Sequence, residues 1–174
     1  DRSPSRGLGD VYKRQPHPTG FWAEELVTPY SIFTGAGWDV DVATPGGEAP
    51  VVDKASLDDS AGDAGTLAEA KAQLEKLEPV LAKPLNLADA NAADYDLVFY
   101  PGGHGPMEDL AVDETSGRIL TERMENKAPV ALLCHAPAAI LAAKNDDGTN
   151  AFAGKQVTAF SNTEEESTGL AENA

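Results

Sequence analysis

The sequence predicts an α/β protein in which a mostly parallel sheet lies between helices on both of its faces. Two observations support this fold class. The composition is 41% hydrophobic but only 6% aromatic, with glycine and proline spread along the chain, which is typical of soluble α/β proteins. Short apolar strands also alternate with helical segments. A chain of 174 residues has the length of one domain with a sizeable core.

The first half of the chain carries three elements. Apolar residues recur at helical spacing from Phe21 to Ala36, which predicts an amphipathic helix. The stretch "WDVDVAT", residues 38–44, alternates apolar and polar side chains as a half-buried strand does. In "TLAEAKAQLEKLE", residues 66–78, Thr66 and Glu69 stand in capping-box register before good helix formers. We expect a charged surface helix there.

The second half repeats the alternation. An apolar strand from Leu97 to Tyr100 runs into the Gly-rich loop "PGGHG", and a helix is predicted near 114–126. A wholly apolar strand from Val130 to Leu133 follows. The stretch "KQVTAF", residues 155–160, is predicted to be a strand, and "SNTEEESTG", residues 161–169, the loop after it.

Charge and cysteine content exclude several classes of protein. Thirteen basic and twenty-nine acidic side chains give a formal charge of -16, which should repel nucleic acid and anionic lipid. The apolar runs are far shorter than the ~20 residues of a membrane helix. A single cysteine forbids an intrachain disulfide, and no secretory signal pattern is visible. We therefore expect a cytoplasmic protein without nucleic acid or membrane partners.

The two ends of the chain differ from its middle. Residues 1–15, "DRSPSRGLGDVYKRQ", are basic, show no strand or helix pattern, and look like translated adapter sequence. We expect a non-native leader over 1–15, with a disordered native tail as the alternative, and a partial domain over 16–174. Because the chain stops at "GLAENA" without a closing element, we expect truncation at both ends.

Cys134, the only cysteine, follows an apolar strand directly. A helix is predicted to start near Ala136, with Pro137 in its first turn. Ligands of parallel sheets gather outside the carboxyl ends of the strands, and a helix N-terminus can lower a cysteine pKa into the range of about 3.5–7.5. The segment is similar to a strained nucleophile elbow, so we expect a reactive thiolate. The alternative is a small hydrophobic residue at the edge of the core.

Several motifs together identify a family. The stretches "PGGHG", "VALLCHAPA" and "GKQVTAFSNTEEE", in this order after "TGFWAEELVTPY", resemble the ThiJ/PfpI superfamily, in particular its glyoxalase III and heat-shock chaperone branch. The resemblance covers the chain from Thr19 to its end. It implies a flavodoxin-like three-layer sandwich of the class I glutamine amidotransferase type. True amidotransferases have glycine after the cysteine, whereas this chain has His135, so that likeness concerns the fold alone.

The resemblance also implies roles for individual residues. Cys134 would be the nucleophile with His135 beside it, and Glu25 would hydrogen-bond the sulfur and shuttle protons. Glu165 would orient His135. Read without the resemblance, Glu25 is equally a solvated residue in the first turn of a helix.

Further positions follow from the same resemblance. The backbone N–H groups of Gly103 and His135 would donate to an oxyanion, and His104 would lie in the substrate pocket or simply in a loop. Glu164 and Glu166 flank the proposed triad acid, so the register of that acid stays open. Judged from composition alone, all three glutamates would lie in a hydrated acidic loop.

The activity that the resemblance implies is that of a glyoxalase III, a lyase of the D-lactate dehydratase class. Methylglyoxal would become lactate through a cysteine hemithioacetal, without glutathione, cofactor or metal, and deglycation could use the same adduct. The chain has no H-E-x-x-H motif and no cysteine pair for metal. The alternatives are a stress-responsive holding chaperone or redox sensor, and a PfpI-type cysteine peptidase or amidase. The family often forms homodimers.

Overall fold

The computed structural model describes residues 19–168, so the predicted leader over residues 1–15 lies outside the described part of the chain. The chain divides into two compact units: residues 19–160 form one, and residues 161–174 belong with residues 1–18 to the other. Each unit is described by itself. The prediction that residues 16–174 form one domain stays a prediction.

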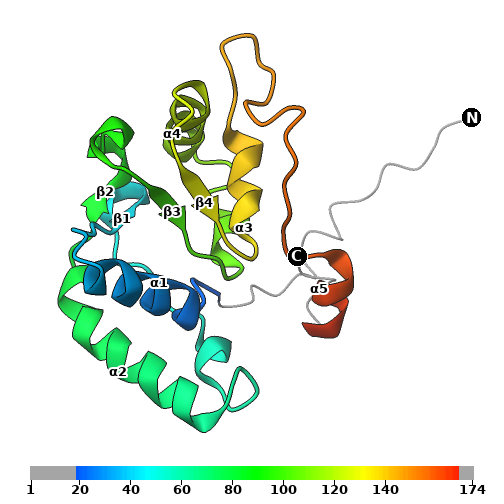
Figure 1. The fold of residues 1–174 in the computed structure, drawn as a ribbon. Helices are drawn as coiled ribbons and strands as arrows, with labels where there is room; N and C mark the ends of the chain where they lie inside the picture. Colours follow the sequence, from blue (N-terminus) through cyan, green and yellow to red (C-terminus); the bar gives the residue numbers. More distant parts are fainter. Residues whose placement is uncertain (1–18, 169–174) are drawn as a thin grey trace, which may run out of the picture. The chain divides into compact units, whose positions relative to one another are not determined.

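The first half of the 19–160 unit is built from two packed helices and a short parallel strand pair (Figure 1). Val27, Ala70 and Leu77 are buried together where the two helices meet. In the strand pair, Ala43 lies opposite Leu85. The elements are α1 (Ala23–Gly35), β1 (Ala43–Thr44), η1 (Pro45–Gly47), η2 (Lys54–Leu57), α2 (Ala64–Leu81), β2 (Leu85–Asn86) and η3 (Leu87–Asp89).

The second half of this unit holds a second parallel pair and the larger core. Leu120, Ala136, Ala139 and Ala143 have no exposed surface, and they pack around Tyr100. Because every pairing between strands is parallel and helices pack beside them, the α/β prediction is confirmed. The elements are η4 (Ala92–Asp94), β3 (Val98–Tyr100), α3 (Gly105–Glu108), α4 (Glu114–Glu125), β4 (Val130–Leu132) and η5 (Ala136–Ala142).

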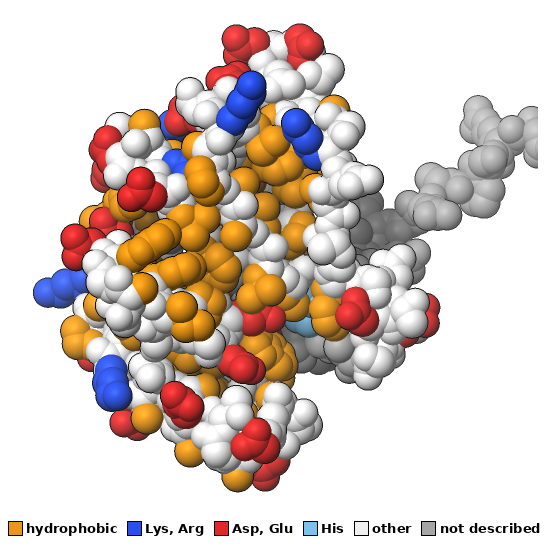
Figure 2. Space-filling view, viewed as in Figure 1, with side chains coloured by type: hydrophobic (Ala, Val, Ile, Leu, Met, Phe, Trp, Pro, Cys, Tyr) orange, Lys and Arg blue, Asp and Glu red, His pale blue; other side chains and the backbone are white. Residues whose placement is uncertain are grey.

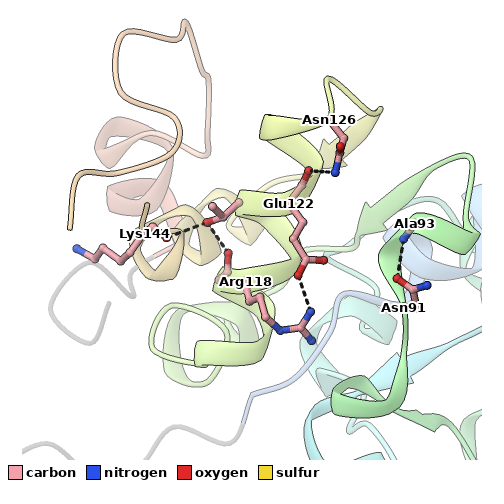
Figure 3. Close-up of polar contacts among 8 residues, drawn as sticks. Asn91, Ala93, Arg118, Glu122, Asn126 and Lys144 are labelled. Carbon is pink, nitrogen blue, oxygen red and sulfur yellow. Dashed lines mark hydrogen bonds and ion pairs between the residues drawn. The ribbon is translucent and has the colours of Figure 1, made fainter. Parts of the chain in front are cut away.

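Polar contacts lie along helix α4, and one of them reaches a neighbouring segment (Figure 3). The Thr121 hydroxyl contacts the Gly117 carbonyl of its own helix (2.9 Å) and the backbone carbonyl of Lys144 (3.3 Å), just beyond η5. On the outer face of the helix, Arg118 forms an exposed ion pair with Glu122 (2.8 Å). Exposed pairs of this kind contribute at most about 1 kcal/mol.

Arg123 is a buried charge, only 3% exposed. Its guanidinium donates to the backbone carbonyls of Ala92, Tyr95, Asp96 and Pro129 at 2.6–3.2 Å. A buried guanidinium must have its N–H groups satisfied, and these carbonyls lie just before β3 and β4. Arg123 therefore fixes where both strands begin.

Two predictions in the first half were wrong in their details. The N-cap of helix α2 lies three residues earlier than predicted, at Asp63, whose carboxylate accepts from the backbone N–H groups of Gly65 (2.9 Å) and Thr66 (3.1 Å). Thr66 is therefore inside the helix rather than its cap. The strand predicted over 38–44 is reduced to two residues, because the parallel register would place residues 38–42 opposite residues 80–84, where helix α2 is only just ending at Leu81.

Two predictions in the second half were also wrong. Residues 155–160 form no strand, and Val157 is 62% exposed, because only Phe160 of that stretch donates to a neighbouring segment. The predicted loop over 161–169 instead contains helix α5 (Asn162–Thr168). The helix predicted to start near Ala136 is present with Pro137 in its first turn, and it is of the 3₁₀ type.

An apolar groove of about 570 Å³ opens between β1 and β3, and Figure 2 shows apolar side chains gathered on this face. Trp38 and Val51 line it and are 49% and 66% exposed. Val98 and Tyr100 use their backbone groups to pair with β4. In a parallel ladder the residue between them, Phe99, then presents its backbone to the opposite edge. That edge of β3 borders the groove.

Within residues 19–168, the helices are all too short or too polar to cross a membrane.

Candidate active site

The site is built at a sharp turn between β4 and η5, which we call the elbow (residues 133–136). Cys134 lies at its tip with φ of 57°, a left-handed conformation that costs a non-glycine residue on the order of 1 kcal/mol. Hydrogen bonds hold the turn: Leu133 N–H donates to the Tyr100 carbonyl (3.1 Å), and Ala136 N–H donates to the Leu133 carbonyl (2.8 Å). The turn leaves the Cys134 side chain half-buried at the end of β4.

Glu25 reaches the elbow from the first turn of α1. Its carboxylate accepts from the Gly102 N–H (2.9 Å) and hydrogen-bonds the Cys134 thiol. The start of the helix is fixed in turn, because Trp22 N–H donates to the Gly102 carbonyl (3.1 Å) and Ala23 N–H donates to Ser56 Oγ (3.1 Å). The structure thus brings together Glu25 and Cys134, which the sequence separates by more than a hundred positions.

The Gly-rich loop after β3 must be free of side chains here. A Cβ on Gly102 would overlap the Glu25 carboxylate, Cys134 Cβ and the Leu133 carbonyl. Gly103 has φ of 92°, and a Cβ there would overlap backbone atoms of the segment that enters α1. Both glycines allow backbone to approach the sulfur closely.

Two backbone N–H groups point at the Cys134 sulfur, those of Gly103 and His135. They are the two donors that the sequence reading assigned to an oxyanion. In this structure their acceptor is the sulfur, so their role toward an oxyanion stays a prediction.

The predicted low thiol pKa is wrong. Burial raises the pKa of Cys134 to about 11; the Gly103 N–H opposes this rise, and the charge of Glu25 adds to it. Burial also raises the pKa of Glu25, although its hydrogen bonds with Cys134 and Gly102 act in the other direction. The prediction counted on the N-terminus of the helix after Cys134 and not on burial, and that helix is a seven-residue 3₁₀ helix. At neutral pH the Cys134 sulfur keeps its proton, and this proton faces the Glu25 carboxylate.

Three rings surround the other side of the sulfur. His135 Nδ1 lies 3.1 Å from Cys134 Sγ. The centroid of the His135 ring lies 4.2 Å from that of His104 and 4.5 Å from that of Phe160. His104 is the residue before α3 and is half-buried, so the structure places it beside the predicted catalytic pair. The structure gives no test of substrate contact at His104.

The predicted triad acid, Glu165, lies in α5, in the other unit. The relative positions of the two units are not determined, so its contact with His135 stays a prediction. Within its own unit the neighbouring Glu164 has a different function. Its carboxylate accepts from Ser161 N–H (2.7 Å), and Ser161 Oγ accepts from Glu164 N–H (3.3 Å). Glu164 is thus engaged in a capping box at the start of α5, and Glu165 and Glu166 are left as the candidates for the triad acid.

Two site residues were missed by the sequence reading. Gly102 donates the backbone N–H that positions Glu25, and Phe160 stacks on His135 while its own N–H donates to the Cys134 carbonyl (2.9 Å). The "GG" of the loop was a signal for Gly102. Nothing local signals Phe160, because its role depends on a contact across 26 positions.

Comparisons with known proteins show the family of the chain. Residues 18–173 match the DJ-1/PfpI family. The chain is 28% identical over 158 residues to a glutathione-independent glyoxalase of Schizosaccharomyces pombe, hsp3102, and 27% identical over 176 residues to the protein/nucleic acid deglycase HchA of Staphylococcus aureus. These alignments cover 87% and 93% of this chain, but only 64% and 54% of the relatives.

Solved structures are similar in fold. The 24-kDa rapid encystment protein of Francisella tularensis superposes with a TM-score of 0.77 at 27% identity, over 88% of this chain and 67% of that one. Glyoxalase III of Candida albicans superposes with a TM-score of 0.75 at 22% identity, over 89% and 65%. The family match spans nearly the whole chain, and the fold is the flavodoxin-like sandwich of those neighbours. This chain belongs to the DJ-1/PfpI family.

Proposed function

We propose that this protein is a glutathione-independent glyoxalase III-type lyase that converts methylglyoxal to lactate. The observation that carries the proposal is the hydrogen-bonded pair of Glu25 and Cys134 at the elbow, with two backbone N–H groups aimed at the same sulfur. The glyoxalase and deglycase relatives support this class of chemistry. Because the chain spans about half to two thirds of those relatives, the activity is a proposal for the whole protein.

In the first step, Cys134 Sγ attacks the aldehyde carbon of methylglyoxal while its proton moves to the Glu25 carboxylate. No free thiolate has to accumulate, because the base is already hydrogen-bonded to the thiol. The raised pKa of Glu25 makes this carboxyl a better proton acceptor than an ordinary glutamate. The carbonyl oxygen then takes this proton from Glu25 and becomes the hemithioacetal hydroxyl, which leaves Glu25 ready to accept the next proton; the N–H groups of Gly103 and His135 are the donors that we propose for this oxygen.

In the second step, the hydrogen on the hemithioacetal carbon leaves as a proton and an enediol forms. Reprotonation at the neighbouring carbon then gives a lactate thioester on Cys134. Glu25 and His135 are the groups near the sulfur that can carry these protons. Water hydrolyses the thioester to lactate and the free thiol. Methylglyoxal plus water equals lactic acid, so the reaction is balanced without an external oxidant or reductant.

Lactate production is the direct test. The 174-residue protein, incubated with methylglyoxal in the absence of glutathione, should form lactate, and Cys134→Ala should abolish it. Lactate formation that survives this substitution would overturn the mechanism. Release of the unmodified amine from a methylglyoxal-treated lysine or guanosine would extend the activity to deglycation. Hydrolysis of small peptide amides without lactate would favour the peptidase alternative.

A holding chaperone is the second candidate, and the groove favours it. An extended apolar segment of an unfolded protein fits an apolar groove bordered by the backbone edge of β3 at Phe99. If this candidate is right, the protein should suppress the aggregation of a heat-denatured client protein. Cys134→Ser should leave this suppression unchanged, whereas Trp38→Ser in the groove should reduce the suppression. Loss of suppression in Cys134→Ser alone would favour a redox sensor instead.

A further inference from the structure

The backbone of His135 fixes where the residue lies but does not by itself determine the rotamer of its side chain. It precedes η5 with φ of −91° and ψ of −6°, and several combinations of χ1 and χ2 are compatible with this backbone. Only some of these orientations keep Nδ1 at 3.1 Å from Cys134 Sγ. Something must therefore select the orientation that the structure shows.

Two rings contact the imidazole closely. The centroids of His104 and Phe160 lie 4.2 Å and 4.5 Å from that of His135, with interplanar angles of 37° and 32°. Two rings this near to one imidazole would overlap if they shared a face of it. They therefore lie on opposite faces, and the imidazole is held between them.

Phe160 is fixed to the elbow at a second point. Its backbone N–H donates to the Cys134 carbonyl at 2.9 Å. The residues before it, from 155 to 159, are exposed and form no strand, so this hydrogen bond and the ring stack are what place Phe160 in its unit. One residue thus contacts both members of the Cys134–His135 pair, the backbone of the first and the ring of the second.

We propose that Phe160 is a positioning residue that holds the His135 imidazole against His104 and so keeps Nδ1 facing Cys134 Sγ. Phe160 touches no reacting atom; it acts through His135. The packing is specific to a flat ring, because an aliphatic side chain at this position cannot cover the imidazole face at a stacking distance. The kinetic consequence rests on the proposed function, whereas the positioning itself does not.

Histidine-selective 15N NMR tests the positioning without any turnover. Cys134→Ala removes the sulfur that Nδ1 contacts. The His135 Nδ1 resonance of this variant is therefore the reference position for an imidazole that lacks the contact. In Phe160→Leu we expect the His135 Nδ1 resonance to move toward that position, and in Phe160→Tyr we expect it to stay where it is in the unaltered protein. Phe33→Leu is the matched control, because Phe33 stacks on Trp38 and meets Phe99 edge to face, away from His135; it should leave the resonance in place.

Turnover provides the second readout. If lactate is formed, Phe160→Leu should lower kcat about 10-fold or more while KM changes little, since misplacing a catalytic group affects the chemical step, and Phe160→Tyr should restore most of kcat. If Phe160→Leu does not fold, Phe160→Met keeps the volume without the ring and takes its place. A His135 resonance unmoved by Phe160→Leu, or moved equally by Phe33→Leu, overturns the proposal. If the protein forms no lactate but the NMR effect is seen, the proposed function is overturned and the positioning role of Phe160 is supported.

Discussion

The elbow and the groove are made of similar apolar sequence, yet they are packed very differently. Around the elbow, Leu120, Ala136 and Ala139 are fully buried, and the strained backbone of Cys134 is held by hydrogen bonds on both sides. Along the groove, Trp38 and Val51 are half or more exposed. The two regions are therefore expected to contribute unequally to stability.

This difference shows where the fold can hold a strained and desolvated group. A residue with φ of 57° persists only when its surroundings hold it in place. A carboxyl and a thiol side by side keep their shifted pKa values only if few water molecules reach them. The elbow meets both conditions because η5 and α4 pack behind it. The groove meets neither, which suits it to binding a flexible apolar partner rather than to chemistry.

The largest expected effect is on catalysis at the elbow. Glu25→Gln keeps the shape of the side chain but removes the base, so we expect lactate formation to fall about 100-fold or more. Glu24→Gln, the exposed neighbour in the same helical turn, should retain activity within about twofold, since removal of an exposed charge has a small effect. Steady-state assays of both variants would decide this; equal losses would show that helix charge, not the Glu25–Cys134 contact, matters.

A second prediction compares the packing of the two regions with one kind of substitution. Leu120 is fully buried behind the elbow, whereas Val51 in the groove is 66% exposed. Leu120→Ala should lower the free energy of unfolding by about 2–5 kcal/mol, and Val51→Ala by about 1 kcal/mol or less. Urea denaturation measures both. Similar losses at the two sites would contradict the contrast drawn between the regions.

A third, smaller effect is expected at Gly102. Its Cβ would overlap Glu25 and Cys134, so Gly102→Ala should destabilise the protein by about 1–3 kcal/mol. It should also weaken the contact between the two side chains. Gly35→Ala is the matched control, because a Cβ at the end of α1 meets nothing within 4 Å; it should stabilise by about 0.5–1 kcal/mol. A neutral Gly102→Ala with full activity would show that the loop can move away from the sulfur.

The sequence predicted the helix over α1, the strand and Gly-rich loop at β3, and the strand before Cys134, because each follows from periodicity or from glycine within about fifteen residues. The family resemblance placed Glu25 next to Cys134. The strand over 155–160 was wrong because an alternating pattern cannot show whether a partner strand is available. The cap at Thr66 was wrong because Asp63 lies nearer the start of the helix and accepts from two N–H groups.

The thiol pKa and the role of Phe160 could not be predicted locally. The pKa of Cys134 depends on burial and on a carboxylate from a distant helix, and both are tertiary effects. Phe160 looked like part of a strand, whereas its position is set by one hydrogen bond and one ring stack.

The central claim is that Cys134 and Glu25 share one proton, and the pH dependence of Cys134 alkylation tests it most directly. Because the pKa of Cys134 is raised to about 11, the thiolate is scarce at pH 8, and the rate of reaction with iodoacetamide should keep rising until the pH reaches about 11. Glu25→Gln removes a charge and a hydrogen bond that both raise this pKa, so its midpoint should shift to lower pH and its alkylation at pH 8 should be faster, even though turnover falls. An alkylation midpoint near 8.5 in the unaltered protein, or one that Glu25→Gln leaves unchanged, would contradict the account.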